Sequence, residues 1–222
     1  MNISSNAAVF KWDKDYLIKL LSTGKKPILT DPVVIQAFQE IDRKDFVPAQ
    51  FRNNAYDDIE INIGYGEELT KPTVIAQMIA QLRPKHGGKY LDLGSGTGYS
   101  AAVLGQIAGP LGKVISIERN QVLWEMARTN IRKYQNIKNI DFIYKDGLDG
   151  FVGQAPYDGI HITFSLEKIP DSLKMQLRMD GGRLVCPTHD GNLYMIERKS
   201  ISEFTEEVIP GFMMDRAKVG IV

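Results

Sequence analysis

The sequence contains little cysteine and no long apolar run. Cys186 is the single cysteine among 222 residues, which excludes a disulfide within the chain. Its setting, Arg-Leu-Val-Cys-Pro, predicts a buried strand in which the thiol acts as a small apolar side chain. No uninterrupted apolar stretch approaches the roughly 18 residues of a membrane-spanning helix, and the N-terminus lacks a basic segment followed by an apolar run. We expect a cytoplasmic protein without a membrane partner.

The sequence also lacks an excess of charge and a metal-ligand pattern. Lys plus Arg and Asp plus Glu number 27 each, so no long-range field would attract nucleic acid. His86, His161 and His189 are scattered without the spacing of metal ligands. We therefore expect neither a nucleic-acid partner nor a bound metal, and we expect a monomer.

The length favours one domain. A chain of 222 residues with 43% hydrophobic content can form one substantial core and is short for a second. Helix-face spacing predicts a first helix that ends at Gly24, with Trp12, Tyr16, Leu17, Leu20 and Leu21 on its apolar face. Asp31-Pro32 supplies a cap and a first-turn proline for a second. We expect a single domain, 1–222, with an N-terminal helical and substrate-lid region, 1–70, and an α/β core, 71–222.

Strand and helix patterns alternate after Pro72, which opens a third helix. The predicted strands are 89–93, 114–117, 141–144, 159–163, 183–187 and 193–198, and the predicted helices between them are 99–108 and 122–133. Such alternation favours right-handed crossovers and a sheet covered on both faces. We expect a Rossmann-like, doubly wound, mostly parallel seven-stranded sheet with an N-terminal helical extension. The 193–198 strand is expected to be antiparallel at the edge.

A glycine-rich loop joins strand 89–93 to helix 99–108, at the sheet edge where open α/β sheets bind ligands. Its spacing is Gly-x-Gly-x-Gly with an acid two residues ahead, whereas the dinucleotide fingerprint has its third glycine one residue later. A pyrophosphate needs a helix N-terminus without a nearby acid, but the ammonium of a methionine group favours one. The loop therefore indicates S-adenosylmethionine, with expected contacts from Asp92, Gly94, Ser95, Gly96, Thr97 and Gly98.

Two later strand ends also carry carboxylates. Glu118 ends the next strand, where it can accept hydrogen bonds from both ribose hydroxyls. Asp146, Gly147 and Leu148 follow the strand after it, and the acid can accept from the adenine amino group. Alone, Glu118 is typical of a solvated strand end and Asp-Gly of an ordinary turn. Three successive strand ends with carboxylates favour a nucleoside site.

At this point the sequence resembles the protein-L-isoaspartate O-methyltransferases, from about Ile41 to about Ile196. The matching stretches are Ile41-Asp42-Arg43-Lys44-Asp45-Phe46-Val47-Pro48, Ala55-Tyr56-Asp57-Asp58, Ile63-Gly64-Tyr65-Gly66, Leu69-Thr70-Lys71-Pro72, the Asp92 to Tyr99 loop, Asp146-Gly147 with Gly150, Ala155-Pro156-Tyr157-Asp158, Ile169-Pro170, Gln176-Leu177 and Gly181-Gly182-Arg183-Leu184-Val185. The resemblance implies transfer of a methyl group from S-adenosylmethionine to the carboxylate of isoaspartyl residues in damaged proteins or peptides, with S-adenosylhomocysteine as product.

The sequence departs from the family pattern on the acceptor side. Thr70 replaces the serine and Thr73 the histidine of the usual Thr-Ile-Ser-x-Pro-His. Phe164-Ser165 stands where the family's Val-Thr-Ala-Ala ends. The basic C-terminal strand Val-Arg-Phe-Val-Pro is expected to be reduced to Val219-Gly220-Ile221-Val222.

The expected acceptor residues are Tyr65, Gly66, Thr70 and Thr163. Thr70 precedes Pro72, where unpaired helix amides and its hydroxyl can grip a carboxylate; the alternative is a plain helix cap. Tyr65 and Gly66 are expected to shape a loop over the cofactor, or to pack only. Thr163 faces the methyl donor or simply ends a strand. Three functions remain open: isoaspartyl methylation, a related carboxyl methyltransferase for a dedicated peptide or small molecule, and a nucleoside-binding protein without catalysis or an NAD enzyme.

Overall fold

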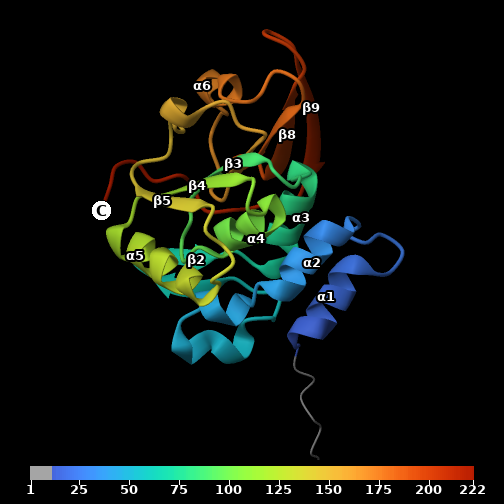
Figure 1. Cartoon of the computed structure of the whole chain (residues 1–222), viewed down its shortest axis with the longest axis vertical. Helices are drawn as coiled ribbons and strands as arrows, with labels where there is room; N and C mark the ends of the chain where they lie inside the picture. The colour runs from blue at the N-terminus through green and yellow to red at the C-terminus, as the bar shows by residue number, and fades with distance from the viewer. Residues whose placement is uncertain (1–11) are drawn as a thin grey trace, which may run out of the picture.

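The computed structural model describes residues 12–222, so residues 1–11 of the expected N-terminal region lie outside the described residues. Its centre is a seven-stranded sheet (Figure 1) made of β3 (Lys89–Leu93), β4 (Lys113–Glu118), β5 (Ile140–Tyr144), β6 (Gly159–Ile162), β7 (Gly182–Pro187), β8 (Asn192–Arg198) and β9 (Phe204–Pro210). The strand order is β5-β4-β3-β6-β7-β8-β9. Strands β3 to β7 pair in parallel, and β8 and β9 are antiparallel. The expected Rossmann-like, mostly parallel sheet is confirmed.

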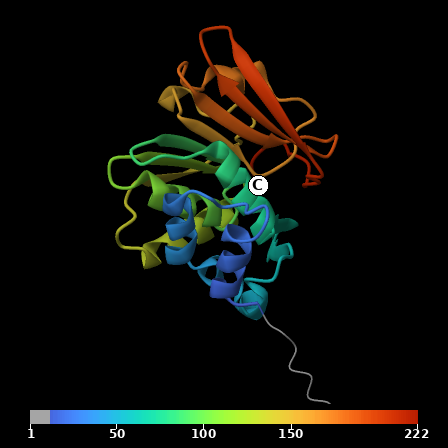
Figure 2. The same cartoon turned by 90° about the vertical axis from the view of Figure 1, so that its right-hand side faces the viewer.

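Helices cover the two faces of the sheet unequally. One buried cluster joins one face to α1 (Lys14–Ser22), α2 (Pro32–Glu40), α3 (Pro72–Leu82), α4 (Tyr99–Ala108) and α5 (Gln121–Asn130). The other face packs on the short α6 (Asp171–Met175) and on neighbouring loops. Figure 2 shows α1 and α2 (blue) and the β8–β9 pair (orange to red) at opposite ends of the view. The described chain also contains short 3-10 helices: η1 (Arg43–Phe46), η2 (Ala49–Asn54), η3 (Ile131–Lys133) and η4 (Val152–Gln154).

The helices begin where capping residues stand. Asp13 accepts a hydrogen bond from Tyr16 N at the start of α1, and Asp31 accepts one from Val33 N before Pro32 of α2. The predicted cap at Asp31 is confirmed. Helix α3 instead begins at Pro72 without a side-chain cap from Lys71, and it ends at Arg83 in the left-handed region.

The predicted 193–198 strand is antiparallel, but its expected edge position is wrong. Strand β9 pairs along its whole length and forms the edge. Most of β9 is exposed, with the acidic pair Glu206 and Glu207 in its centre, so its sequence carries little apolar alternation. Residues 219–222, the expected C-terminal strand, form none.

The N-terminal region, expected to be helical, also contains a β-hairpin. Strand β1 (Ile61–Gly64) pairs with β2 (Glu67–Leu69). Tyr65 and Gly66 form the connection with φ values of 59° and 69°. Positive φ at both central residues is typical of the tight turns that join antiparallel strands. The hairpin places Glu67 to Leu69 beside the carboxyl ends of the central strands.

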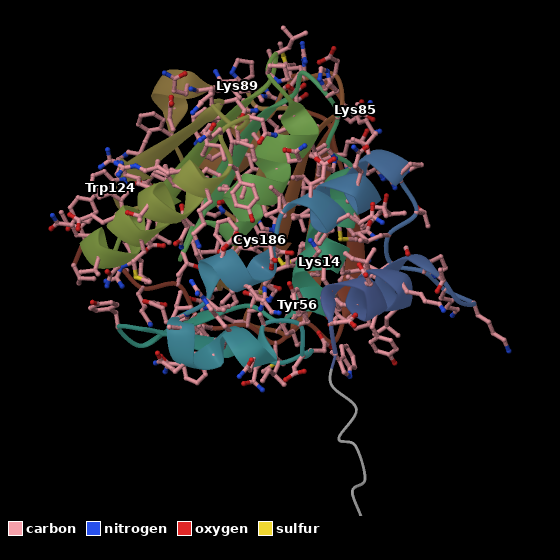
Figure 3. The ribbon with its side chains drawn as sticks, turned by 60° about the horizontal axis from the view of Figure 1, so that its bottom comes forward. Lys14, Tyr56, Lys85, Lys89, Trp124 and Cys186 are labelled. Carbon is pink, nitrogen blue, oxygen red and sulfur yellow. The ribbon has the colours of Figure 1, made fainter. Side chains whose placement is uncertain are left out.

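Cys186 lies in β7, in the interior of the molecule (Figure 3), and its side chain is fully buried. Burial raises the pKa of its thiol far above neutrality. The prediction of a buried, small apolar side chain is confirmed. None of the helices among residues 12–222 has the length and apolar character needed to cross a membrane.

Candidate functional site

A pocket of about 330 Å³ opens at the carboxyl ends of four neighbouring parallel strands. Strands β5, β4, β3 and β6 each supply residues to it at or just after their carboxyl ends. Chain order reverses at β3, which has β4 on one side and β6 on the other, and such switch points are where open α/β sheets bind ligands. The β1–β2 hairpin and residues 213–218 form the remaining wall. The polar and charged residues that line the whole pocket include Glu60, Glu67, Glu68, Thr70, Ser95, Ser100, Glu118, Arg119, Asp146, Thr163, Asp215, Arg216 and Lys218.

The glycine loop after β3 lines the floor of the pocket through Gly94, Ser95 and Gly96. Its backbone donors are used inside the protein: Gly94 N and Ser95 N donate to Ile117 O at 2.9 and 3.1 Å, and Gly98 N donates to Ser95 O. Gly96 N donates to Glu118 Oε2 at 2.8 Å. A pyrophosphate site needs such N–H groups to be free, so the loop does not offer one.

Close packing explains two of the glycines. A Cβ on Gly94 would lie 2.5 Å from Thr163 Oγ1, and one on Gly98 would lie 3.0 Å from Ala127 Cβ. Both glycines have positive φ. Thr97, also expected at the cofactor, is fully buried and does not line the pocket.

Glu118 lies at the end of β4 and is only 5% exposed, with its carboxylate at the pocket wall. Oε2 accepts from Gly96 N, and Oε1 accepts from Asn120 N at 2.9 Å. Burial raises the pKa of this carboxyl above its usual range. A carboxylate has about four acceptor positions, so about two remain for hydroxyl donors in the pocket.

Asp146 follows β5 and lines the pocket with Gly147 and Leu148. Oδ1 accepts from Leu148 N at 3.0 Å, and Oδ2 accepts from Gly220 N at 2.6 Å. The second contact comes from residues 219–222, which run beside the start of α5 near the C label of Figure 1. Asp146 is therefore held in place from two sides and keeps part of its acceptor capacity.

Asp92 differs from its expected role at the ligand ammonium. Its side chain is fully buried and does not line the pocket. The carboxylate accepts hydrogen bonds from Ser116 Oγ at 2.7 Å and from Ser100 Oγ at 3.1 Å, and it lies 2.8 Å from His161 Nδ1. The residue alternation of β3 turns Asp92 toward α4, and sequence spacing alone did not give that direction.

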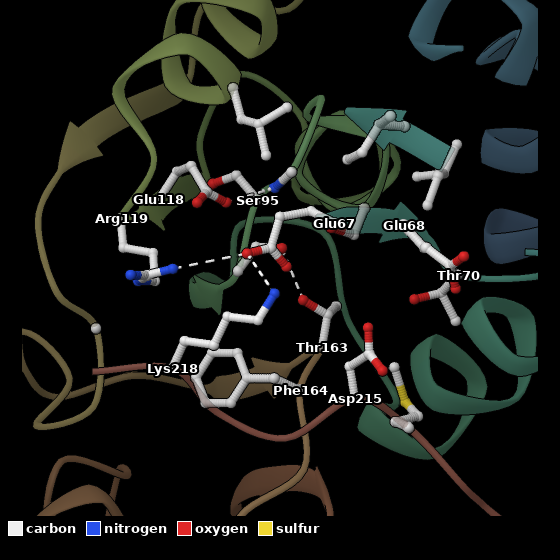
Figure 4. A pocket seen from close by; sticks show the side chains of 18 of the residues that line it. Glu67, Glu68, Thr70, Ser95, Glu118, Arg119, Thr163, Phe164, Asp215 and Lys218 are labelled. Carbon is white, nitrogen blue, oxygen red and sulfur yellow. Dashed lines mark hydrogen bonds and ion pairs between the residues drawn. The ribbon is translucent and has the colours of Figure 1, made fainter. Parts of the chain in front are cut away.

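Thr70 lies on the pocket side opposite Glu118, between β2 and α3 (Figure 4). Its side chain is 9% exposed, and its hydroxyl has no hydrogen-bond partner within residues 12–222. The alternative role as helix cap is wrong, because Lys71 holds the cap position. Asp58 instead accepts from Thr73 N at 2.9 Å and from Thr73 Oγ1 at 2.7 Å. Thr73, in the place of the family's histidine, thus serves the helix start.

Arg43 fixes the backbone at Thr70. The residue is 1% exposed, and its guanidinium donates to Thr70 O at 2.7 Å and to Ala55 O at 2.9 Å and lies over the Tyr99 ring. Burial lowers the pKa of this guanidinium to about 10, so it stays protonated at neutral pH. Spacing did not reveal this contact, because Arg43 and Thr70 are 27 residues apart.

Thr163 and Phe164 line the pocket at the end of β6. The Thr163 hydroxyl donates to Leu93 O at 3.0 Å and to Gly94 O at 2.7 Å, so it braces the glycine loop. Ser165 is 1% exposed and donates to Met214 O at 3.0 Å. Of the two residues that differ from the family pattern, Phe164 therefore forms part of the pocket wall and Ser165 holds residues 213–218 in place.

Tyr65 and Gly66 do not line the pocket, and Tyr65 is 60% exposed at the hairpin turn. The neighbouring Glu67 takes part instead. Its carboxylate pairs with Lys218 Nζ at 2.9 Å and with Arg119 Nη1 at 3.6 Å, as the dashed lines in Figure 4 show. Arg119 could have been found from its place directly after Glu118. Lys218 and Glu67 are 151 residues apart, and no local pattern links them.

Comparisons with known proteins show which family the chain is similar to. Residues 13–209 match the family model described as protein-L-isoaspartate(D-aspartate) O-methyltransferase. A protein-L-isoaspartate O-methyltransferase of Methanothrix thermoacetophila is 42% identical over 69% of this chain and 72% of its own length. One from Fervidobacterium nodosum is 37% identical over 79% and 86%. A solved Plasmodium falciparum structure, assigned to the same enzymes and in complex with S-adenosyl-L-homocysteine, has a TM-score of 0.79 at 23% identity over 92% of this chain and 97% of that one.

Proposed function

The chain belongs to the protein-L-isoaspartate O-methyltransferase family and is an S-adenosylmethionine-dependent methyltransferase, and we propose that both of its substrates meet in the pocket described above. The reaction moves a methyl group to the carboxylate of isoaspartyl residues in damaged proteins or peptides. The observation that carries the assignment is that Glu118, Asp146 and the glycine loop line one pocket with the free hydroxyl of Thr70.

The pocket residues fit the cofactor. Glu118 would accept from the ribose hydroxyls and Asp146 from the adenine amino group, since each carboxylate keeps acceptor positions beyond its backbone contacts. The glycine loop keeps the floor free of side chains at Gly94 and Gly96. The same loop favours S-adenosylmethionine over NAD, because its N–H groups are already used within the protein.

The bound cofactor supplies an electrophilic methyl group on its sulfonium. The acceptor carboxylate, with an ordinary pKa of about 4, is ionised at neutral pH and needs no general base. The chain's task is therefore to bind and orient, an effect that can contribute roughly 7 to 11 kcal/mol. In this assignment, the Thr70 hydroxyl donates a hydrogen bond that holds the substrate carboxylate, and Arg43 fixes the backbone at Thr70.

We also propose that residues 12–222 work as one domain. The helices α1 and α2 share a buried cluster with α3 and α4, so the N-terminal region has no core of its own. The hairpin within it reaches the pocket through Ile63 and Glu67 to Leu69. The term lid then applies to this hairpin and not to the helices.

The experiment that tests the function is methyl transfer from labelled S-adenosylmethionine to two peptides that differ only in carrying isoaspartate or aspartate at one position. Base-labile label in the isoaspartyl peptide alone supports the proposal. If neither peptide is labelled although the cofactor binds normally, the acceptor substrate would instead be a dedicated peptide or small molecule. Binding of NAD in place of S-adenosylmethionine would contradict the whole assignment.

A further inference from the structure

A row of buried polar side chains crosses the middle of the sheet. Ser116 of β4, Asp92 of β3 and His161 of β6 are register neighbours, and all three are fully buried. The preceding same-face neighbours, Tyr90 and Val114, are buried in the hydrophobic core. A carboxylate buried in such a layer is costly unless it is hydrogen-bonded. The hydrogen-bond partners of Asp92 are therefore what allows the carboxylate to lie in the core.

The row is connected to the glycine loop and to the helix that follows it. Ser116 Oγ donates to Asp92 Oδ2 at 2.7 Å and is hydrogen-bonded to Ser95 Oγ, within the loop. Ser100, in the first turn of α4 after the loop, donates to the same carboxylate at 3.1 Å. Ser95 and Ser100 both line the pocket. The Asp92 carboxylate thus holds the loop and the following helix at one point.

His161 contributes a single hydrogen bond to this arrangement. Nδ1 lies 2.8 Å from Asp92 Oδ1, so Nδ1 carries the proton that faces the carboxylate. Nε2 is buried and has no hydrogen-bond partner among residues 12–222. Every polar contact of this imidazole is therefore directed at Asp92.

We propose that His161 is a positioning residue for the cofactor, which it does not touch. Its Nδ1–H orients the Asp92 carboxylate, and that carboxylate sets the position of Ser95 and Ser100 at the pocket floor. This inference rests on the proposed function, because the ligand concerned is the S-adenosyl cofactor. It predicts that loss of the Nδ1 donor weakens cofactor binding and leaves binding of the acceptor peptide unchanged.

A pair of matched variants tests the donor. The amide nitrogen of His161→Asn takes nearly the place of Nδ1, whereas that of His161→Gln takes nearly the place of Nε2. We expect the S-adenosylhomocysteine affinity of His161→Asn to be close to wild type. We expect a loss of about 10-fold or more in His161→Gln and in His161→Leu, as for a hydrogen bond to a charged group. The KM for an isoaspartyl peptide should not change. Equal affinity in all variants would overturn the proposal.

Two further measurements separate positioning from general stability. Ile160→Ala, on the same strand but facing the other core, should lower the melting temperature without a change in cofactor affinity. Adding His161→Leu to Asp92→Asn should weaken affinity no further, because the histidine acts through Asp92. Additive losses would overturn the proposal. If the wild type itself binds no S-adenosylhomocysteine, the proposed function fails instead.

Discussion

The backbone N–H of Gly220 donates to Asp146 Oδ2 at 2.6 Å, so residues 219–222 fasten the carboxylate assigned to adenine. Further contacts hold this segment: Val222 N donates to Arg119 O at 2.9 Å, Gln121 N donates to Val222 O at 2.8 Å, and Arg119 Nε donates to Gly220 O at 2.7 Å. Arg119 follows Glu118, so one segment joins the ribose and adenine sides of the pocket. None of residues 219–222 lines the pocket, which marks the segment as a support of the site and not an occupant.

Gly220→Pro should therefore weaken cofactor binding, because proline has no N–H to hold Asp146. We expect S-adenosylhomocysteine to bind roughly 3- to 10-fold more weakly and to leave faster, a modest loss because water can replace part of the contact. Stopped-flow release and titration would measure both. Gly220→Ala is the control for strain, since it keeps the N–H at the native φ of 80°, where a side chain is strained; proline, whose ring fixes φ near −65°, also moves the backbone. Equal effects of the two variants would assign the loss to backbone strain.

Glu118→Ala should weaken S-adenosylmethionine binding by roughly 1.5 to 3 kcal/mol, the range for loss of a charged hydrogen-bonding partner. Isothermal titration measures the change directly. Unchanged affinity would remove Glu118 from the ribose site.

The raised pKa of Glu118 gives a pH dependence of stated sign. As the pH falls through this pKa, the carboxyl takes a proton and loses acceptor capacity, so affinity should fall by up to about tenfold per pH unit. The unfolding free energy of the ligand-free protein should change in the opposite direction. A folded pKa above the unfolded one adds stability at low pH, and this contribution is lost as the pH rises through the folded pKa. Both trends should be absent from Glu118→Gln, whose amide does not titrate. The same pH profiles in the variant as in the wild type would contradict them.

Arg43→Lys should disturb the acceptor side and not the cofactor. A single ammonium cannot reproduce the fork that reaches Thr70 O and Ala55 O, and a stranded buried carbonyl costs about 1 to 3 kcal/mol. We expect a lower melting temperature and a higher KM for an isoaspartyl peptide, with cofactor affinity retained. Arg52→Lys, on the partly exposed η2 turn, is the matched control. A rise in peptide KM for both variants would refute the link to Thr70.

Much of the cofactor side follows from local sequence. The loop Gly94 to Gly98, Glu118 and Asp146 each stand at the end of an apolar strand, and parallel strands bring such ends together. The direction of Asp92 did not follow, because a change of one residue in a strand turns a side chain to the other face. A carboxylate near a glycine loop can bind the ligand or stabilise the loop. For Asp92, the contacts with Ser116 and His161 distinguish these roles, and both residues are distant in the sequence.

The acceptor side is harder to predict from the sequence, because its contacts join segments that are distant along the chain. Arg43 reaches Thr70, Asp58 caps α3 at Thr73, and Lys218 pairs with Glu67 from the far end of the chain. Strand β9 was missed for another reason: an exposed edge strand with acidic residues lacks the apolar alternation that marks a strand.

The central claim is that the acceptor carboxylate meets Thr70 in the pocket that holds the cofactor, and the kinetics of Thr70 variants test it most directly. Thr70→Ser keeps the hydroxyl and should keep activity, whereas Thr70→Val keeps the shape without a donor. We predict that kcat/KM for an isoaspartyl peptide falls roughly 10- to 150-fold in Val, the equivalent of one hydrogen bond to a charged group. Cofactor affinity should be unchanged, and so should the melting temperature, because Thr70 does not cap α3. Full activity in Thr70→Val would contradict the account.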